Sequence, residues 1–147
     1  MNILEVFNNK LLWVAVLSWF VAQALKILVT LIEDHRFDIT KLWASGGMPS
    51  SHSSFVMALT TGVGQQVGFN SMEFAICMVF SFIVMYDAAN VRLEAGKQAV
   101  FINQIIKVLE NPNLNSEQRL KEILGHTPLQ VVAGCLLGIT IGLLCYM

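Results

Sequence analysis

Two histidines lie directly before apolar segments of the chain, each beside glycine and hydroxyl side chains. His52 stands in the run GGMPSSHSS (46–54), and His126 stands in LGHTP (124–128). A helix that begins at such a point presents free N–H groups and the positive end of its dipole, which together favour a bound phosphate. Imidazole exchanges protons at a pH of about 6.5. The two segments therefore predict a phosphate site with two candidate catalytic groups, His52 and His126.

Cations that could bind the phosphate occur near the same surface. Lys26 lies inside the first apolar run, a costly position for a charge that has neither a partner nor a route to the surface. Asp87 and Arg92 follow the third apolar run. Each residue also has a plainer interpretation. Lys26 could extend its side chain to the surface, Asp87 could be an ion-pair partner, and Arg92 could anchor the helix at the headgroups. The serines could act only as a helix cap. The predicted phosphate-binding residues are Gly47, Ser50, Ser51, Lys26 and Arg92.

Metal binding is a weaker interpretation of the same residues. Two histidines and Asp87 could form a ligand set, but no i,i+4 or Cys-x-x-Cys spacing prearranges it. The three cysteines, Cys77, Cys135 and Cys145, lie within apolar runs, where thiols usually act as small hydrophobic side chains. We expect neither a metal nor another cofactor.

The composition places these residues in an integral membrane protein. Of the 147 residues, 55% are hydrophobic and 13% are charged, whereas soluble domains carry about 25% charge. The mean hydropathy is +0.63, and the net charge of −1 gives no indication of a nucleic-acid partner. Four apolar runs predict an all-α helical bundle that forms one domain over 1–147. The predicted transmembrane spans are 11–32, 53–69, 72–88 and 129–147.

Between the third and fourth spans, apolar residues continue at helical spacing. Val91, Ala95, Ala99 and Ile102 follow this spacing and predict that the third helix leaves the membrane as an amphipathic cytoplasmic helix. A second, short surface helix is predicted over 116–124.

The fourth span contains Gly134, Gly138 and Gly142, one glycine every four residues. Such a face allows two helices to pack closely in a membrane. The sequence leaves open whether the partner helix belongs to the same chain or to a second copy in a homodimer.

The basic residues predict the orientation. Four crossings place both termini on one side and the loops 33–52 and 87–128 on the other. The terminal side has Lys10, whereas the loop side has Arg36, Lys41, Arg92, Lys97, Lys107, Arg119 and Lys121. By the positive-inside rule, the loops and the predicted site face the cytoplasm and the termini lie outside. We expect a multi-pass protein of a bacterial inner (plasma) membrane.

Three sequence blocks, in this order, also carry a family resemblance: GGMPSSHSS, YDAANVRLEAGKQA and LGHTPLQVVAG. They resemble divergent members of the type 2 phosphatidic acid phosphatase superfamily, which are acid phosphatase and vanadium haloperoxidase-related membrane proteins. The resemblance extends from the first span to the last. It implies a helical membrane phosphatase that needs no metal and works through a phosphohistidine.

The resemblance further implies roles for single residues. In the superfamily, a Pro-Ser-Gly-His segment binds phosphate and its histidine protonates the leaving group; the segment that ends at His52 is similar, with Ser51 in the glycine's place. A later His-x-x-x-Asp supplies the nucleophilic histidine, which His126 matches. Gln130 stands where that motif has its aspartate, and Glu122 or Asp87 could supply the missing carboxylate in space.

The superfamily's cationic motifs are also altered. Its early Lys-x6-Arg-Pro motif is changed here, because Lys26 and Arg36 are ten residues apart and no proline follows. Arg92 is assigned to the phosphate-binding arginine by position and charge alone.

We therefore expect a lipid phosphate phosphatase at the cytoplasmic face, with membrane phospholipid as its partner and phosphatidylglycerophosphate or phosphatidate as favoured substrates. His126 would attack phosphorus and His52 would protonate the departing alkoxide. The alternative is a catalytically inactive scaffold or lipid-binding protein on the same fold, which the Gln130 replacement favours. A transporter or channel subunit fits less well, because Lys26 is the one charged residue that lies well inside a predicted span.

Overall fold

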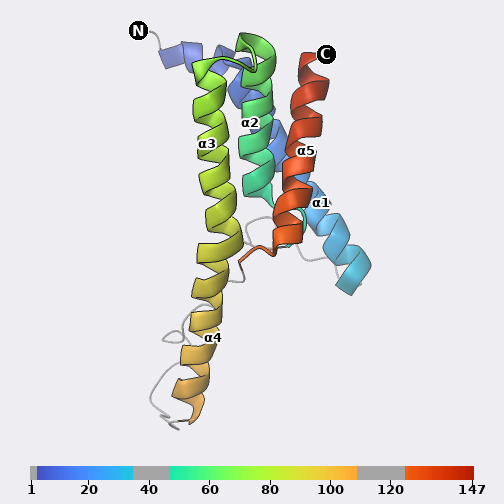
Figure 1. Cartoon of the computed structure of the whole chain (residues 1–147). Coiled ribbons are helices and arrows are strands. Elements are labelled where there is room, and N and C mark those ends of the chain that lie inside the picture. Colours follow the sequence, from blue (N-terminus) through green and yellow to red (C-terminus); the bar gives the residue numbers. More distant parts are fainter. Residues whose placement is uncertain (1–2, 35–46, 109–124) are drawn as a thin grey trace.

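The computed structural model describes residues 3–34, 47–108 and 125–147, and every regular element in these ranges is a helix (Figure 1). The elements are η1 (Ile3–Asn8), α1 (Lys10–Asp34), α2 (Ser51–Val67), α3 (Met72–Tyr86), the π-helical segment η3 (Asp87–Val91), α4 (Arg92–Val108) and α5 (Pro128–Tyr146). The predicted all-α membrane bundle is confirmed. The short surface helix predicted over 116–124 lies outside the described residues.

Three helical stretches in the described ranges are long and apolar enough to cross a membrane. They are Lys10–Ile32, Met72–Lys107 and Pro128–Tyr146. The helix α2, with 17 residues, is shorter and less apolar, but it runs beside the others in the same bundle (Figure 1). The bounds of α1, α2 and α5 lie within a few residues of the ranges predicted as spans, whereas α3 ends at Tyr86 and η3 takes up the last residues of the third range.

The helix α2 occupies the centre of the bundle and packs against α1, α3 and α5. Most of its residues from Ser51 to Gly64 are buried. Its hydroxyl groups bond to neighbouring helices: Ser54 pairs with Ser18 of α1 at 2.6 Å, and Thr60 pairs with Ser81 of α3 at 2.8 Å. A weakly apolar helix can lie at membrane depth when its neighbours satisfy its polar groups in this way.

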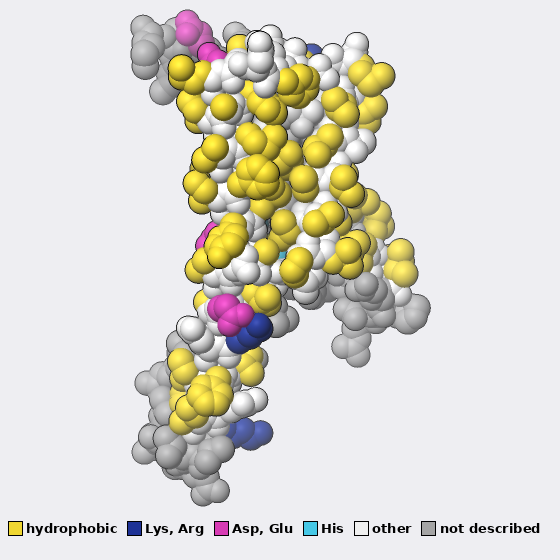
Figure 2. All heavy atoms as spheres, viewed as in Figure 1, with side chains coloured by type: hydrophobic (Ala, Val, Ile, Leu, Met, Phe, Trp, Pro, Cys, Tyr) yellow, Lys and Arg dark blue, Asp and Glu magenta, His cyan; other side chains and the backbone are white. Residues whose placement is uncertain are grey.

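Polarity in this bundle is reversed relative to a soluble domain. Buried positions hold mostly small or hydroxyl side chains, whereas large hydrophobic side chains cover the outside of the bundle (Figure 2). On the visible face, charged side chains gather on α4 and near the N-terminal end of the bundle (Figure 2). Lipid chains remove the outer side chains from water, so the bundle interior is free to hold polar contacts.

The helices α3, η3 and α4 form one continuous helical rod that leaves the bundle at the end opposite the termini (Figure 1). Within η3, the Arg92 N–H donates to the Asp87 carbonyl five residues earlier, which is the π-helical pattern. Such π segments often occur at functional sites. The predicted continuation of the third helix is confirmed as far as Val108, where the described residues of this segment end.

The three glycines of α5 face α2 of the same chain. A Cβ at Gly134 would overlap the Ser50 carbonyl oxygen, one at Gly138 would overlap the Ser54 carbonyl oxygen, and one at Gly142 would lie 2.7 Å from the Thr61 Cβ. The residues Gly134, Gly138 and Gly142 are all buried. This face is therefore an internal helix contact: of the two partners that the sequence left open, the structure places a helix of the same chain against the three glycines.

The close approach of α5 to α2 predicts a strong effect of added bulk at Gly138. Gly138→Val should lower the free energy of unfolding by about 2–3 kcal/mol, because the new side chain meets α2 backbone that cannot move aside. Val132→Leu, on the exposed face of α5, is the matched control and should change stability little. Thermal unfolding in detergent measures both, and equal stability of the two variants would contradict the internal packing.

Candidate functional site

The first turns of α2 and α5 meet at the end of the bundle away from the termini. Each helix has a hydroxyl cap: the Ser50 side chain accepts from the Ser53 N–H, and the Thr127 side chain accepts from the Gln130 N–H. The Ser50 N–H in turn donates to the Gln130 carbonyl oxygen at 3.0 Å. This backbone bond ties the two helix starts together, so that the N–H groups and positive dipole ends of both helices lie in one region.

His126 is held between α5 and the π-helical segment. Its backbone N–H donates to the Ala88 carbonyl at 3.1 Å, and its residue exposure is only 2%. The preceding residue, Gly125, lies so close to the backbone of Arg92 and Leu93 that a Cβ there would overlap both. The chain can pass η3 at this point because residue 125 has no side chain.

The two predicted catalytic histidines come together in the structure. The ring centroids of His52 and His126 are 6.1 Å apart, with the rings inclined by 66°. Within the described residues, the buried Nδ1 atom of His52 and the buried Nε2 atom of His126 have no hydrogen-bond partner. A buried polar atom without a partner is costly and calls for an explanation such as a ligand. Both rings are close enough to contact one phosphoryl group.

Lys26 adds a buried positive charge to the same cluster. Its residue exposure is 1%, so its side chain does not reach the surface as one interpretation of the sequence proposed. Gly47, with φ of 84°, covers this side chain: a Cβ at Gly47 would lie 3.0 Å from Lys26 Cγ. A glycine is needed at residue 47 both for the positive φ and for this close contact.

The surroundings of His126 favour its neutral form. Burial lowers the pKa of His126 below its usual value, the contact with the Gln130 side chain opposes this shift, the charges of Lys26 and His52 lower the pKa further, and the nearby Gly47 backbone opposes it. A neutral imidazole keeps a lone pair on one ring nitrogen, which is the state that a nucleophile or base needs.

Gln130, which stands in place of the aspartate of the family motif, lies beside the ring of His126. Its Oε1 atom is 3.3 Å from Nδ1 of His126 and also accepts the Thr127 backbone N–H at 3.1 Å. The sequence indicated that residue 130 follows His126 by one helical turn, but it did not indicate that the amide would contact the ring.

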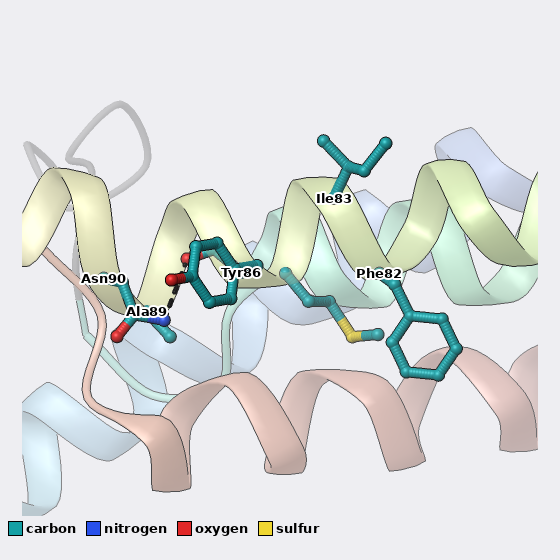
Figure 3. Close-up of a pocket in the computed structure, with 6 residues that line it drawn as sticks. Phe82, Ile83, Tyr86, Ala89 and Asn90 are labelled. Atoms are coloured by element: carbon teal, nitrogen blue, oxygen red, sulfur yellow. Dashed lines mark hydrogen bonds between the residues drawn. The ribbon is translucent and has the colours of Figure 1, made fainter.

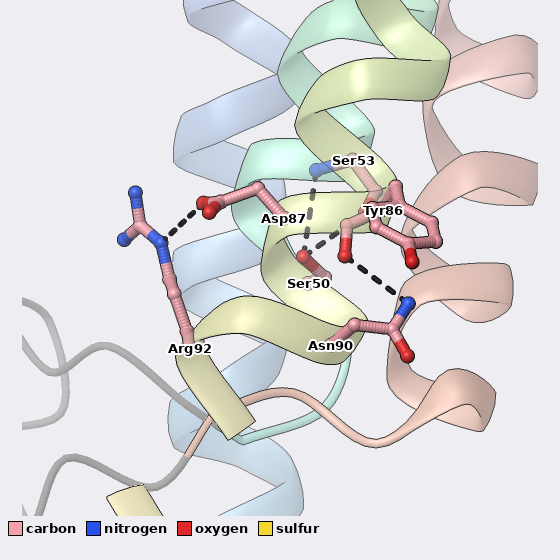
Figure 4. A network of polar contacts seen from close by, with 6 residues as sticks. All are labelled: Ser50, Ser53, Tyr86, Asp87, Asn90 and Arg92. Carbon is pink, nitrogen blue, oxygen red and sulfur yellow. Dashed lines mark hydrogen bonds and ion pairs between the residues drawn. The ribbon is translucent and has the colours of Figure 1, made fainter. Parts of the chain in front are cut away.

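Asp87 and Arg92 form an ion pair at the rim of the cluster. The Arg92 Nε atom lies 2.7 Å from an Asp87 carboxylate oxygen, and both side chains are substantially exposed (Figure 4). Burial lowers the pKa of His52, and the charges of Arg92 and Lys26 lower this pKa further, while Asp87 opposes the shift. Asp87 is thus the partner of Arg92 and makes no hydrogen bond to His126 within the described residues, while Glu122 lies outside them.

The serines of the GGMPSSHSS run serve mainly to build the bundle. The Ser50 hydroxyl caps α2 and also accepts a bond from the Ser53 hydroxyl at 3.1 Å (Figure 4). Ser51 is buried, and Ser54 bonds to α1. This arrangement supports the plainer interpretation of the Ser50 side chain as a cap, while the start of α2 still directs its backbone N–H groups to this region.

Two features of the site could not be identified from the sequence as such. The π-helical segment, which provides the Ala88 carbonyl for His126, has no local signal in its residues. Gly125 gave a signal only as a glycine next to His126, and its contact with the start of α4 required the tertiary structure. In the described ranges, no three His, Cys, Asp or Glu side chains gather as a metal-ligand set.

The fold and this cluster define a helical membrane protein with two histidines and a buried lysine at the meeting point of two helix N-termini. The model of the divergent PAP2 family matches residues 7–141, and the chain belongs to that family. An uncharacterized membrane protein of Bacillus subtilis (strain 168), YuiD, is 35% identical to it, over 95% of this chain and 96% of that protein. No solved structure matches the chain significantly.

The lowered pKa of His126 predicts a pH-dependent stability. The unfolded chain takes up a proton on residue 126 near pH 6.5, before the folded chain does, so stability is complete above that pH and is lost as the pH falls below it. Between pH 7 and pH 5, His126→Asn should lose less unfolding free energy than the wild type, by up to about 1.4 kcal/mol per pH unit. Thermal unfolding in detergent at several pH values measures this slope, and parallel slopes would contradict the prediction.

Proposed function

We propose that the protein is a membrane lipid phosphate phosphatase that works through a phosphohistidine. The observation that carries the proposal is the pair of histidines 6.1 Å apart, each with a buried ring nitrogen that has no partner in the described residues. The buried Lys26 next to them supplies positive charge for the phosphoryl oxygens. Membership of the divergent PAP2 family supports phosphatase chemistry at this site.

In the proposed reaction, the lone pair on Nε2 of His126 forms a bond to phosphorus while the phosphorus–oxygen ester bond breaks. His52, in its protonated form, gives a proton to the departing alkoxide. Water then attacks the phosphohistidine, His52 takes a proton from that water, and inorganic phosphate leaves with His126 restored. Lys26 and the N–H groups at the start of α2 stabilise the phosphoryl charge, which is the main requirement in phosphoryl transfer.

A shallow apolar groove on α3 and η3 supports a lipid as substrate. It is lined by α3 and η3 residues, namely Phe82, Ile83, Met85, Tyr86, Ala89 and Asn90 (Figure 3). The groove includes Ala89 of η3, which follows Ala88, the residue whose carbonyl accepts the backbone N–H of His126. We propose that an acyl chain of the substrate occupies this groove.

The basic residues of the loops favour a cytoplasmic site. We propose a substrate made on that face, with phosphatidylglycerophosphate preferred and phosphatidate second. The rival function is a catalytically inactive, lipid-binding scaffold. Such a protein would have the same groove and the same histidine cluster but would not hydrolyse a substrate.

Phosphate release by the detergent-purified protein tests the proposed activity. We expect turnover of phosphatidylglycerophosphate or phosphatidate in the presence of EDTA, and a loss of at least about 1,000-fold in His126→Asn, because the nucleophile is removed. The substrate series should include undecaprenyl diphosphate as a lipid of the opposite face. No turnover on any substrate, from a folded preparation, would favour the scaffold.

The two lysine variants Lys26→Gln and Lys97→Gln provide a matched comparison. Lys26→Gln should lower kcat/KM by on the order of 100-fold, because a buried cation near the phosphoryl group is lost. Lys97 is exposed on α4 and pairs with Glu94, so Lys97→Gln should keep the wild-type activity. An equal effect of the two substitutions would contradict the placement of Lys26 in the site.

The groove predicts a dependence on acyl-chain length. Ala89→Leu should raise KM for a long-chain phosphatidate several-fold and leave a short-chain, water-soluble analogue unaffected, because the added side chain fills the groove. Ala75→Leu, on the same helix but farther from the histidines, is the control and should leave both KM values unchanged. Equal effects of Ala89→Leu on both substrates would contradict an acyl-binding role.

A further inference from the structure

The side-chain amide of Gln130 has its orientation determined by the backbone. The Thr127 N–H group can only donate, and it lies 3.1 Å from one terminal atom of this amide. That atom must therefore be the oxygen, because an amide NH₂ group cannot accept a hydrogen bond. The bond is one arm of the capping box of α5, in which the Gln130 N–H also donates to the Thr127 hydroxyl.

The same oxygen faces the ring of His126. Oε1 of Gln130 lies 3.3 Å from Nδ1 of His126, and an oxygen that cannot donate requires a donor opposite it. The favoured neutral tautomer of His126 therefore carries its proton on Nδ1. The other ring nitrogen, Nε2, is left with a lone pair, and it is the buried atom that has no hydrogen-bond partner among the described residues.

We propose that Gln130 is a positioning residue that fixes the tautomer of His126, so that the lone pair of Nε2 faces the substrate phosphorus. This inference rests on the proposed function, and it assigns to a neutral amide the orienting task of the aspartate that the family motif has at this position. The capping box then has two roles, because the same Gln130 oxygen caps the N-terminus of α5 and orients the ring of His126.

The neutral amide has a consequence that a carboxylate would not have. The Gln130 contact raises the pKa of the ring, and a carboxylate beside Nδ1 would raise it further, because its negative charge would also stabilise the imidazolium. The charged and titratable groups that face His126 are Lys26 of α1 and His52 of α2, and both oppose protonation. His126 thus stays neutral, and able to attack, at a lower pH than it would with an aspartate.

Three variants separate positioning from a purely structural role. Gln130→Leu removes the acceptor and should lower kcat by on the order of 100-fold or more, because the ring loses its fixed tautomer. Gln130→Glu keeps an acceptor for both donors, so it should keep turnover while the acidic limb of the pH–rate profile moves to higher pH. Gln98→Leu, on the exposed face of α4, is the matched control and should match the wild type. A Gln130→Glu profile that does not move, or a fully active Gln130→Leu, would overturn the proposal.

The tautomer can be measured without any substrate. We would record nitrogen NMR spectra of the protein labelled with ¹⁵N-histidine in detergent, and assign residue 126 by the signal that is lost in His126→Asn. The expected result is a protonated Nδ1 and an unprotonated Nε2 in the wild type, and a mixture of tautomers in Gln130→Leu. A protonated Nε2 in the neutral wild-type ring would overturn the proposal. The expected tautomers without turnover would instead contradict the proposed function and leave the positioning by Gln130 supported.

Discussion

The close contact between α5 and α2 determines where the two histidines lie. Three glycines remove the side chains that would separate these helices, and α2 backbone carbonyls occupy the space where a Cβ would be. With the helices in backbone contact, the Ser50 N–H reaches the Gln130 carbonyl, and the helix starts are held at one depth. The orientation of His126 and its distance to His52 depend on this contact. A few ångströms of separation would leave two unconnected interfacial histidines.

The bundle uses polar groups as its internal contacts because lipid supplies the apolar surroundings. In water, burial of large hydrophobic side chains stabilises a core, but lipid tails are as apolar as leucine, so helix association in a membrane depends on close packing and hydrogen bonds. The hydroxyl pairs between α2 and its two neighbours show this directly. A buried lysine and two buried imidazoles can persist at the end of such a bundle, where polar backbone from η3 and the loop segments at residues 47 and 125 surrounds them.

The departure from the family motif has a physical account in this arrangement. An amide in place of the carboxylate keeps the hydrogen bond to the ring and gives up the negative charge. A neutral orienting group also adds no negative charge to the cluster in which Lys26 is buried. Gln130 in place of the aspartate is therefore compatible with the proposed phosphatase activity and does not by itself favour an inactive scaffold.

Much of this protein follows from the sequence alone. An apolar segment long enough to cross a membrane forms a helix, because a helix makes all of its backbone hydrogen bonds within the segment itself. The cap signals Ser50 and Thr127-Pro128 begin α2 and α5 as predicted, and the two histidines, the lysine and the glycine spacing could all be identified as candidates. Each of these features depends on neighbours within a few residues along the chain.

The tertiary structure decided what depends on distance between segments. The sequence allowed the glycine face to meet a second copy, and the structure places it against α2 because that helix offers accessible backbone and small side chains. It allowed three candidates for the group beside His126, and the structure brings Gln130 there while Asp87 pairs with Arg92. The π-helical segment and the close contact of Gly125 with the start of α4 have no local signature. Their cause is the fit of one segment against another, which a linear pattern of residues does not contain.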